Sequence, residues 1–181
     1  EARGQYLAFQ DDDDEWYPWK LEKQMKKFEA VSEDVGVVYT GIWRISETSR
    51  AYVPSGRIRR LEGNIYDVIL EGNFIDLPAA IVRKECLSEG GGFDEALPCL
   101  QDWDLWIRIS KRYYFAYIDE PSLDAYYSRD SISIDYGKAL IAVKHITNKY
   151  FDEFKKRKEA LAKTYILTGD LLCVCGAMKE G

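Results

Sequence analysis

Four consecutive aspartates, Asp11 to Asp14, separate an apolar stretch from a helix-like pattern, and this arrangement constrains the fold more than any other feature of the sequence. Residues Gln5 to Gln10 predict a fully buried strand, and the residues from Pro18 to Ala30 repeat apolar side chains at helical spacing. Adjacent carboxylates at the end of a buried strand repel one another and are costly to desolvate. The run is therefore either a solvated acidic turn at the start of a helix, or a set of oxygen ligands for a hard divalent cation.

Strand and helix patterns alternate along most of the chain. Strands are expected at residues 35–45, 51–54, 78–82, 113–118 and 122–127, and helices at residues 64–70 and 101–110. From Asp135 onward the pattern is helical almost to the end, with a break near Tyr150. This alternation predicts an α/β fold, with one domain over residues 1–134 and a helical extension over residues 135–181 packed on the same domain.

Length, charge and residue counts limit the function classes. With 181 residues the chain can form one sizeable core, and its net charge of -6 argues against a nucleic-acid binder. A single histidine, His145, argues against a histidine-based metal site or catalytic triad. The four cysteines have no zinc-binding spacing, no stretch is long enough to cross a membrane, and there is no signal-peptide pattern. We therefore expect a cytoplasmic protein with reduced thiols.

A second landmark combines a glycine turn with a helix. The three glycines Gly90 to Gly92 let the backbone approach a ligand closely or take positive φ angles, although a flexible turn is the simpler interpretation. In the helix expected over residues 101–110, Trp103 and Trp106 share one face, and Asp102 lies at the start. Asp102 is either a first-turn carboxylate favoured by the helix dipole or a chemically active group.

Both segments resemble one known family. Residues Gly4 to Leu21 resemble the Asp-X-Asp segment of family 2 glycosyltransferases. Residues Gly91 to Arg108 resemble the family's later block, Gly-Gly-Phe-Asp-Glu followed by Glu or Gln and Asp-Trp-Asp-Leu-Trp-X-Arg. The resemblance extends to about Ser133 and implies a GT-A fold, a Rossmann-like mixed sheet flanked by helices. In this family the strands that hold the nucleotide base precede the Asp-X-Asp segment, so we expect a partial GT-A domain without those strands.

The resemblance also implies the chemistry. By position, Asp13 is a ligand of Mn²⁺ or Mg²⁺, and Asp11 lies near that metal or near the ribose of a nucleotide-diphospho-sugar donor. Gly91 and Gly92 line the acceptor or diphosphate side. Asp102 is the expected general base, which removes the proton of a hydroxyl on a glycan or lipid-linked acceptor. A single base opposite the leaving group gives direct displacement with inversion at the anomeric carbon, and the cation neutralises the departing diphosphate.

Further expectations accompany this interpretation. Asp104, two residues after Asp102 on the same helix, is expected to point elsewhere and to be structural. The family's next block, a Tyr-Arg pair with a nearby histidine, is replaced here by Tyr126 to Arg129 without a histidine, which leaves any metal or diphosphate contact of this block in doubt. An unpaired strand edge favours self-association as a homodimer. Peripheral association with a membrane is compatible with the sequence, which has no transmembrane segment.

Two alternatives stay open. The chain is either an active transferase or a truncated, non-catalytic piece that folds without binding donor tightly, and titration with nucleotides separates the two. A magnesium-dependent phosphate-ester hydrolase would also use an acidic run. It needs further carboxylates or a lysine at strand ends, and the sequence shows no such set.

Overall fold

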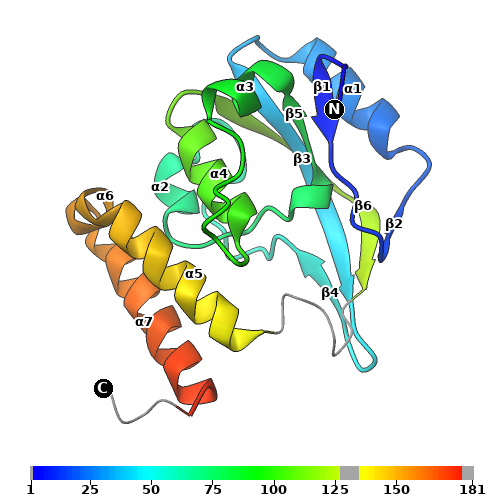
Figure 1. Ribbon diagram of the computed structural model, residues 1–181. Coiled ribbons are helices and arrows are strands. Elements are labelled where there is room, and N and C mark those ends of the chain that lie inside the picture. The colour runs from blue at the N-terminus through cyan, green and yellow to red at the C-terminus, as the bar shows by residue number, and fades with distance from the viewer. Residues whose placement is uncertain (1, 127–134, 177–181) are drawn as a thin grey trace.

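The computed structural model describes residues 2–126 and 135–176, which fold around one mixed sheet (Figure 1). Its strands are β1 (Tyr6–Ala8), β2 (Asp14–Trp16), β3 (Val35–Ile45), β4 (Arg50–Val53), β5 (Ala80–Arg83) and β6 (Tyr114–Tyr126). The helices are α1 (Lys20–Ala30), α2 (Tyr66–Ile69), the 3-10 turn η1 (Leu77–Ala79), α3 (Lys84–Glu89), α4 (Gln101–Ser110), α5 (Tyr136–Lys149), α6 (Phe151–Lys156) and α7 (Lys158–Val174). The predicted α/β class, with a mixed sheet flanked by helices, is confirmed.

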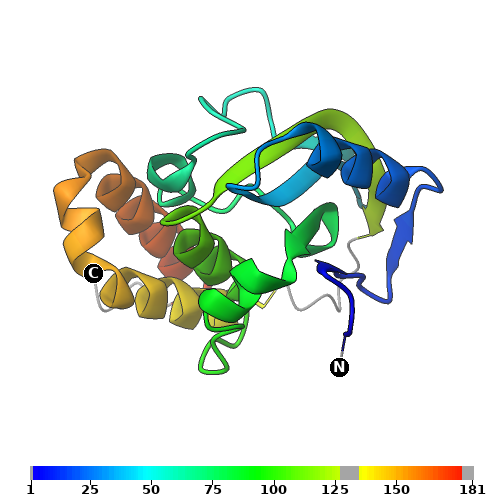
Figure 2. The ribbon, with the colours of Figure 1, turned by 90° about the horizontal axis from the view of Figure 1, so that it is seen from above.

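The sheet has the strand order β1-β5-β3-β6-β2, and β4 pairs with β3. β3 and β6 run parallel, whereas the other pairs are antiparallel. β3 lies at the centre because its residues suit burial on both faces, and Val37, Val38 and Tyr39 have no exposed surface. Val38 packs with Phe28 of α1 on one face, while Val37 and Tyr39 face the larger core on the other. Figure 2 shows α1 and the α3–α4 pair on opposite sides of the sheet.

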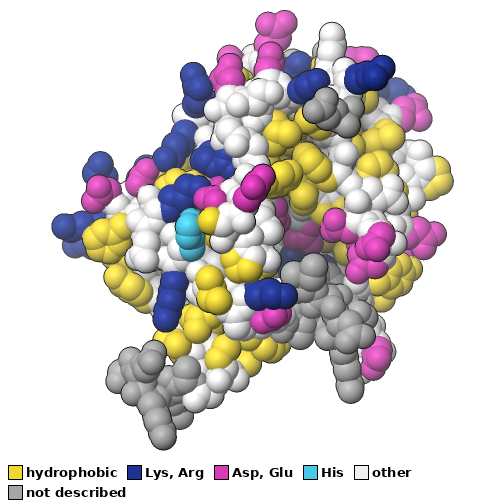
Figure 3. All heavy atoms as spheres, in the orientation of Figure 1, with side chains coloured by type: hydrophobic (Ala, Val, Ile, Leu, Met, Phe, Trp, Pro, Cys, Tyr) yellow, Lys and Arg dark blue, Asp and Glu magenta, His cyan; other side chains and the backbone are white. Residues whose placement is uncertain are grey.

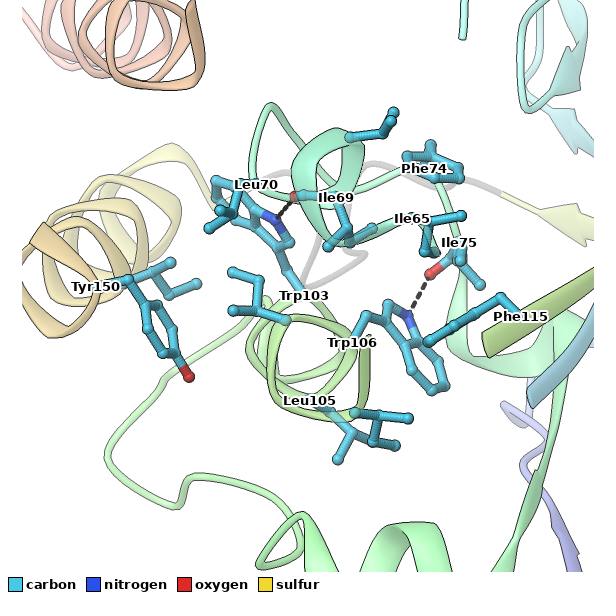
Figure 4. Close-up of a cluster of buried hydrophobic side chains, with 14 of the residues drawn as sticks. Ile65, Ile69, Leu70, Phe74, Ile75, Trp103, Leu105, Trp106, Phe115 and Tyr150 are labelled. Carbon is cyan, nitrogen blue, oxygen red and sulfur yellow. Dashed lines mark hydrogen bonds between the residues drawn. The ribbon is translucent and has the colours of Figure 1, made fainter. Parts of the chain in front are cut away.

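Helix α4 is the main element of the larger core. The side chains of Trp103 and Trp106 are buried among residues from α2, β6 and the tail helices (Figure 4). Each indole N–H needs an acceptor when it is buried. That of Trp103 donates to the Ile69 carbonyl at 2.7 Å, and that of Trp106 donates to the Ile75 carbonyl at 2.8 Å. The two bonds fix the loop after α2 against α4.

The three tail helices pack on the same core. Ala142, Ile146 and Phe154 are fully buried and belong to the cluster that contains the α4 tryptophans. The predicted break near Tyr150 is confirmed, because α5 ends at Lys149 and α6 begins at Phe151. The predicted domain boundary falls next to residues 127–134, which lie outside the described ranges. Within those ranges no helix is both long and apolar enough to span a membrane.

Three sequence expectations need correction. The strand expected to be fully buried over Gln5 to Gln10 is the three-residue β1, which is only partly buried and pairs with β5 alone within the described part. The two strands expected over 113–127 are one strand, β6. Its pairing with β3 shifts register around Gly41, opposite Pro121, and such an irregularity is where a strand tolerates a proline. The short elements β2 and α3 were not predicted.

Candidate active site

The acidic run forms a crossing over the sheet. β1 lies at one end of the strand order and β2 at the other, so residues 9–13 pass from one edge to the opposite edge (Figure 1). Asp11, Asp12 and Asp13 are exposed on this crossing, and Asp14 opens β2 opposite Ala125 of β6. Figure 3 shows acidic side chains gathered over this part of the molecule. The run is thus held at both ends by strand pairing.

Burial and repulsion between neighbouring aspartates both raise pKa values in the acidic run. Burial, together with Asp11, Asp13 and Asp76, raises the pKa of Asp14 from 3.8 to about 7. The pKa of Asp11 is also raised, by burial first and then by its aspartate neighbours and Asp76. The Oδ2 atom of Asp14 is buried and has no hydrogen-bond partner among the described residues. Among the residues that the structure describes, Asp11 and Asp14 therefore form no ion pair that would stabilise their ionised forms.

Asp76, which the sequence did not single out, links the two predicted motifs. It accepts two bonds from the Arg44 guanidinium, Nε to Oδ2 at 3.1 Å and Nη2 to Oδ1 at 2.5 Å. Arg44 is paired with Ala125, the residue that also pairs with Asp14, so Arg44 and Asp14 share one row across the sheet. The charge of Asp76 raises the pKa of Asp14 at the run and of Asp102 on α4.

Asp102 lies in the first turn of α4, as predicted. Its Oδ2 accepts a hydrogen bond from Asn73 Nδ2 at 2.8 Å, and its Oδ1 accepts from the Trp103 backbone N–H at 2.8 Å. Burial and the charge of Asp76 raise its pKa from 3.8 to about 6, against the opposing effect of these bonds. Leu100, the residue before α4, has a φ of 58°, and within the described ranges it is the one residue other than glycine with a positive φ. A carboxyl group of this pKa is ionised at neutral pH and more basic than an ordinary one, which suits a general base.

Asp104 points to the other side of the helix, as predicted. Its carboxylate is fully buried and accepts from Arg108 Nε at 2.9 Å, from Lys149 Nζ at 2.8 Å and from the Tyr150 hydroxyl at 2.7 Å. Burial raises its pKa, but these donors outweigh burial and the net pKa is lowered. Asp104 therefore joins α4 to the C-terminal end of α5 and is structural.

The glycine turn lies between the two motifs. Gly91 and Gly92 have φ values of 81° and 70°, which side chains rarely adopt. The Gly92 carbonyl accepts from Arg108 Nη2 at 2.6 Å, which ties the turn to α4. The ring of Phe93 meets that of Phe9 edge-on at 5.6 Å between centroids. Because Phe9 follows β1, this contact places the turn beside the entrance to the acidic run.

The residues present fit a divalent cation that is shared with a substrate. No cluster of three or more histidine, cysteine or acidic side chains is placed to hold a metal within the described ranges. Mg²⁺, however, is commonly bound by one or two carboxylates together with substrate phosphates and waters. The raised pKa values of Asp11 and Asp14 and the unpartnered Asp14 oxygen are what such a cation would relieve. The predicted ligand Asp13 is exposed on the same crossing.

Comparisons with known proteins decide the family. The model of glycosyltransferase-like family 2 matches residues 1–169. The chain belongs to this family. The GT-A-like architecture of the chain agrees with solved structures of TarS from S. aureus. The structure of TarS residues 1–349 gives a TM-score of 0.51 at 17% sequence identity, and the match covers 82% of this chain and 42% of the TarS chain. A second TarS structure gives 0.53 at 16% identity, over 81% and 25% of the respective chains. At these identities the likeness shows the fold alone.

Curated relatives in the family are similarly named. The chain is 30% identical over 136 residues to an uncharacterized glycosyltransferase, MJ1057, of Methanocaldococcus jannaschii, covering 71% of this chain and 46% of that protein. It is 29% identical over 110 residues to an uncharacterized glycosyltransferase of Rickettsia felis, covering 59% of this chain and 18% of that protein. The chain thus spans less than half the length of these relatives.

The sequence singles out Asp11, Asp13 and Asp102 as candidate site residues, and the structure adds three residues around them. Asn73 and Asp76 lie in a loop without any pattern, and Asp14 was treated only as part of the run. The one available signal for Asp76 was an acidic side chain just before a buried strand, which many loops share. The block from residue 127 to residue 133 that departs from the family pattern lies outside the described ranges.

Proposed function

We propose that the protein transfers a sugar from a nucleotide-diphospho-sugar to an acceptor hydroxyl, with inversion at the anomeric carbon. The observation that carries the proposal is the Asp102 carboxyl group, whose pKa of about 6 is raised partly by Asp76, the residue that also acts on the acidic run. This shared neighbour supports a single site that combines a base with a carboxylate-rich donor side. Membership of family 2 supports the reaction class.

Each residue has a stated part in the proposed reaction. Asp11, Asp13 and Asp14 would hold Mn²⁺ or Mg²⁺ beside the donor diphosphate. The cation, when bound, supplies positive charge that stabilises the departing diphosphate. Asp102 accepts the proton of the acceptor hydroxyl while that oxygen forms its bond to the anomeric carbon.

The same proposal assigns a role to the glycine turn and a class of acceptor. The backbone at Gly91 and Gly92 borders the acceptor or diphosphate side. The acceptor is a glycan or a lipid-linked sugar, which peripheral association with a membrane would bring within reach. We also retain a cytoplasmic location and a homodimer as proposals.

The experiment compares three single variants in the full-length protein. Release of nucleoside diphosphate from a panel of nucleotide-diphospho-sugars is measured beside donor affinity, with Mn²⁺ or Mg²⁺ present. Asp102→Asn should lower turnover by about 10²–10⁴-fold with donor affinity retained, because the amide cannot accept the proton. Asp13→Asn should weaken metal-dependent donor binding as well as turnover.

Asp104→Asn is the matched control for the choice of base, with rates compared at a temperature where each variant is folded. If Asp102→Asn keeps normal turnover, Asp102 is not the base. If wild-type protein binds no nucleotide in calorimetry at any metal concentration, the non-catalytic alternative holds and the proposal is wrong.

A further inference from the structure

We propose that Asn73 is a positioning residue for the Asp102 base: its side-chain amide holds the carboxylate in one orientation and favours its ionised form. The inference rests on the proposed role of Asp102, because positioning matters only if that carboxylate acts in the reaction. The contact itself is an Nδ2 to Oδ2 hydrogen bond of 2.8 Å between a loop and a helix that are 29 residues apart.

The loop that carries Asn73 is fixed to the helix that carries Asp102. The indole N–H groups of Trp103 and Trp106 donate to the carbonyls of Ile69 and Ile75, which bracket Asn73 on either side (Figure 4). Both indoles are buried, so neither bond competes with water. Asn73 is therefore held at a constant distance from the first turn of α4.

The orientation of the Asn73 amide is also determined. Its Oδ1 accepts the Ile75 backbone N–H at 3.2 Å, which assigns the oxygen to the loop and leaves Nδ2 to face Asp102. A flipped amide would set its NH₂ group against a backbone N–H and its oxygen against a carboxylate. Both contacts would be repulsive, so the asparagine can adopt only the donating arrangement.

The Asp102 carboxylate is then fixed at both oxygens. Oδ1 is held by the Trp103 N–H of its own helix and Oδ2 by Asn73. Asn73 opposes the effect of Asp76, since a donor favours the charged form and a neighbouring negative charge disfavours it.

Asn73→Asp is the decisive variant because it is isosteric. The new carboxylate still accepts the Ile75 N–H, but in its ionised form it cannot donate to Asp102 and it adds a negative charge beside it. Asn73→Ser is the second variant, since a hydroxyl can accept the same N–H but is too short to reach Asp102. Asn64→Asp is the matched control: Asn64 also accepts a backbone N–H two residues on, from Tyr66 at 3.1 Å, and it is exposed.

The first measurement needs no substrate. The titration of the Asp102 carboxyl carbon is followed by NMR in the full-length protein, with the signal assigned by its loss in Asp102→Asn. We expect both Asn73 variants to titrate at higher pH than wild type, with the larger shift for Asn73→Asp, and Asn64→Asp to titrate like wild type. A wild-type titration midpoint in both Asn73 variants would overturn the inference.

The second measurement is the pH dependence of nucleoside diphosphate release from the donor that wild type uses. At pH 6 the Asn73 variants should turn over about fivefold more slowly than wild type, because a pKa raised by about one unit leaves about a tenth of Asp102 ionised instead of half, and the deficit should shrink as pH rises. A purely structural role would give a loss that is the same at every pH, and that result would contradict the proposal. If instead Asp102→Asn retains turnover, the proposed base is wrong, while the titration still reports on the Asn73 contact.

Discussion

Asp102 and Asp104 are two residues apart on one helix, yet their environments have opposite effects. Asp104 is completely buried, but it accepts from an arginine, a lysine and a tyrosine, and its pKa is lowered. At Asp102, burial and the neighbouring charge of Asp76 outweigh the hydrogen bonds from an amide and a backbone N–H, and the pKa rises to about 6. Burial raises the pKa of both carboxyl groups, so the charged donors around Asp104 decide which carboxylate stabilises the fold.

The difference extends to the surroundings of each residue. Around Asp102 and the acidic run, Asp11, Asp14 and Asp102 all have raised pKa values. Around Asp104, at the junction of α4 with α5, the bond from Lys149 helps to hold the pKa of Asp94 at about 2. The charges around Asp104 stabilise the fold. Those around Asp102 and the acidic run destabilise it, which leaves these carboxylates able to bind a cation or a proton.

The largest expected effect comes from breaking the buried network. Asp104→Asn leaves Arg108 and Lys149 without their shared carboxylate, which should lower the free energy of unfolding by about 3–5 kcal/mol, the usual result of removing one partner of a buried ion pair. Because the folded pKa of Asp104 lies below its unfolded value, the deficit should be complete at pH 7 and shrink as pH falls below about 4. Urea unfolding at several pH values measures it. A deficit of a few tenths of a kcal/mol would mean that the network contributes little.

A buried cation provides a second test of the same rule. Lys20 of α1 is fully buried, donates to Gln24 Oε1 at 2.6 Å and lies over the Trp16 ring at 4.5 Å, and burial lowers its pKa to about 7. Below pH 7 the charged amine destabilises the fold, and this effect disappears as pH rises toward 10.5.

The stability of wild type relative to Lys20→Met should therefore rise between pH 7 and pH 10, by roughly 3 kcal/mol. Paired urea titrations at both pH values give this difference. Lys23→Met, at a half-exposed lysine that bonds to Glu120, should show no such rise and is the control. If the two variants behave alike, burial is not what perturbs Lys20.

The third prediction tests Asp102 from the side of stability. Its folded pKa of about 6 exceeds the unfolded 3.8, so its ionisation destabilises the fold above pH 6 and has no effect below about pH 4. Asp102→Asn should therefore raise the free energy of unfolding at pH 7 by about 1–3 kcal/mol, while it lowers turnover. The gain should vanish near pH 4. A loss of stability at pH 7 would show that the carboxylate stabilises the fold as Asp104 does.

The smallest effect concerns the turn between the two regions. Gly92 has φ 70°, and a Cβ added there would meet no atom within 4 Å, so Gly92→Ala introduces backbone strain without a clash. We expect a loss of about 1 kcal/mol, measured by thermal unfolding. Gly169→Ala, within α7 and equally open, should instead raise stability by about 0.5–1 kcal/mol. Equal shifts in the two variants would exclude strain at Gly92.

The sequence was sufficient where a pattern is local. Helices α1 and α4, strand β3 and the break at Tyr150 follow from periodicity, and the contrast between Asp102 and Asp104 follows from their positions on a helix. β2 was missed because Asp14 to Trp16 has no strand pattern; these residues are extended only because β6 pairs with them. The gap expected between residues 118 and 122 lies within β6, where the pairing with β3 shifts register at Gly41, opposite Pro121.

The site was only half predictable for a related reason. Asn73 and Asp76 come near Asp102 because two indoles fix their loop to α4, and no spacing in the sequence encodes a contact between elements. The glycine turn was recognised by its motif, but its bond to Arg108 was not. The motifs thus indicate the candidate groups, whereas packing sets the direction in which their pKa values shift.

The crossing between β1 and β2 also has a consequence for how the molecule folds. Tyr6 of β1 pairs with Arg83, and Trp16 of β2 pairs with Leu123. Both strands that hold the acidic run therefore pair with segments that come much later in the sequence. Such non-local pairings close large loops and form slowly, after local helices and turns. During synthesis β2 would therefore leave the ribosome long before its partner β6 is made. Until β6 has formed, the four aspartates remain an unstructured acidic segment, and the site exists only once the sheet is complete.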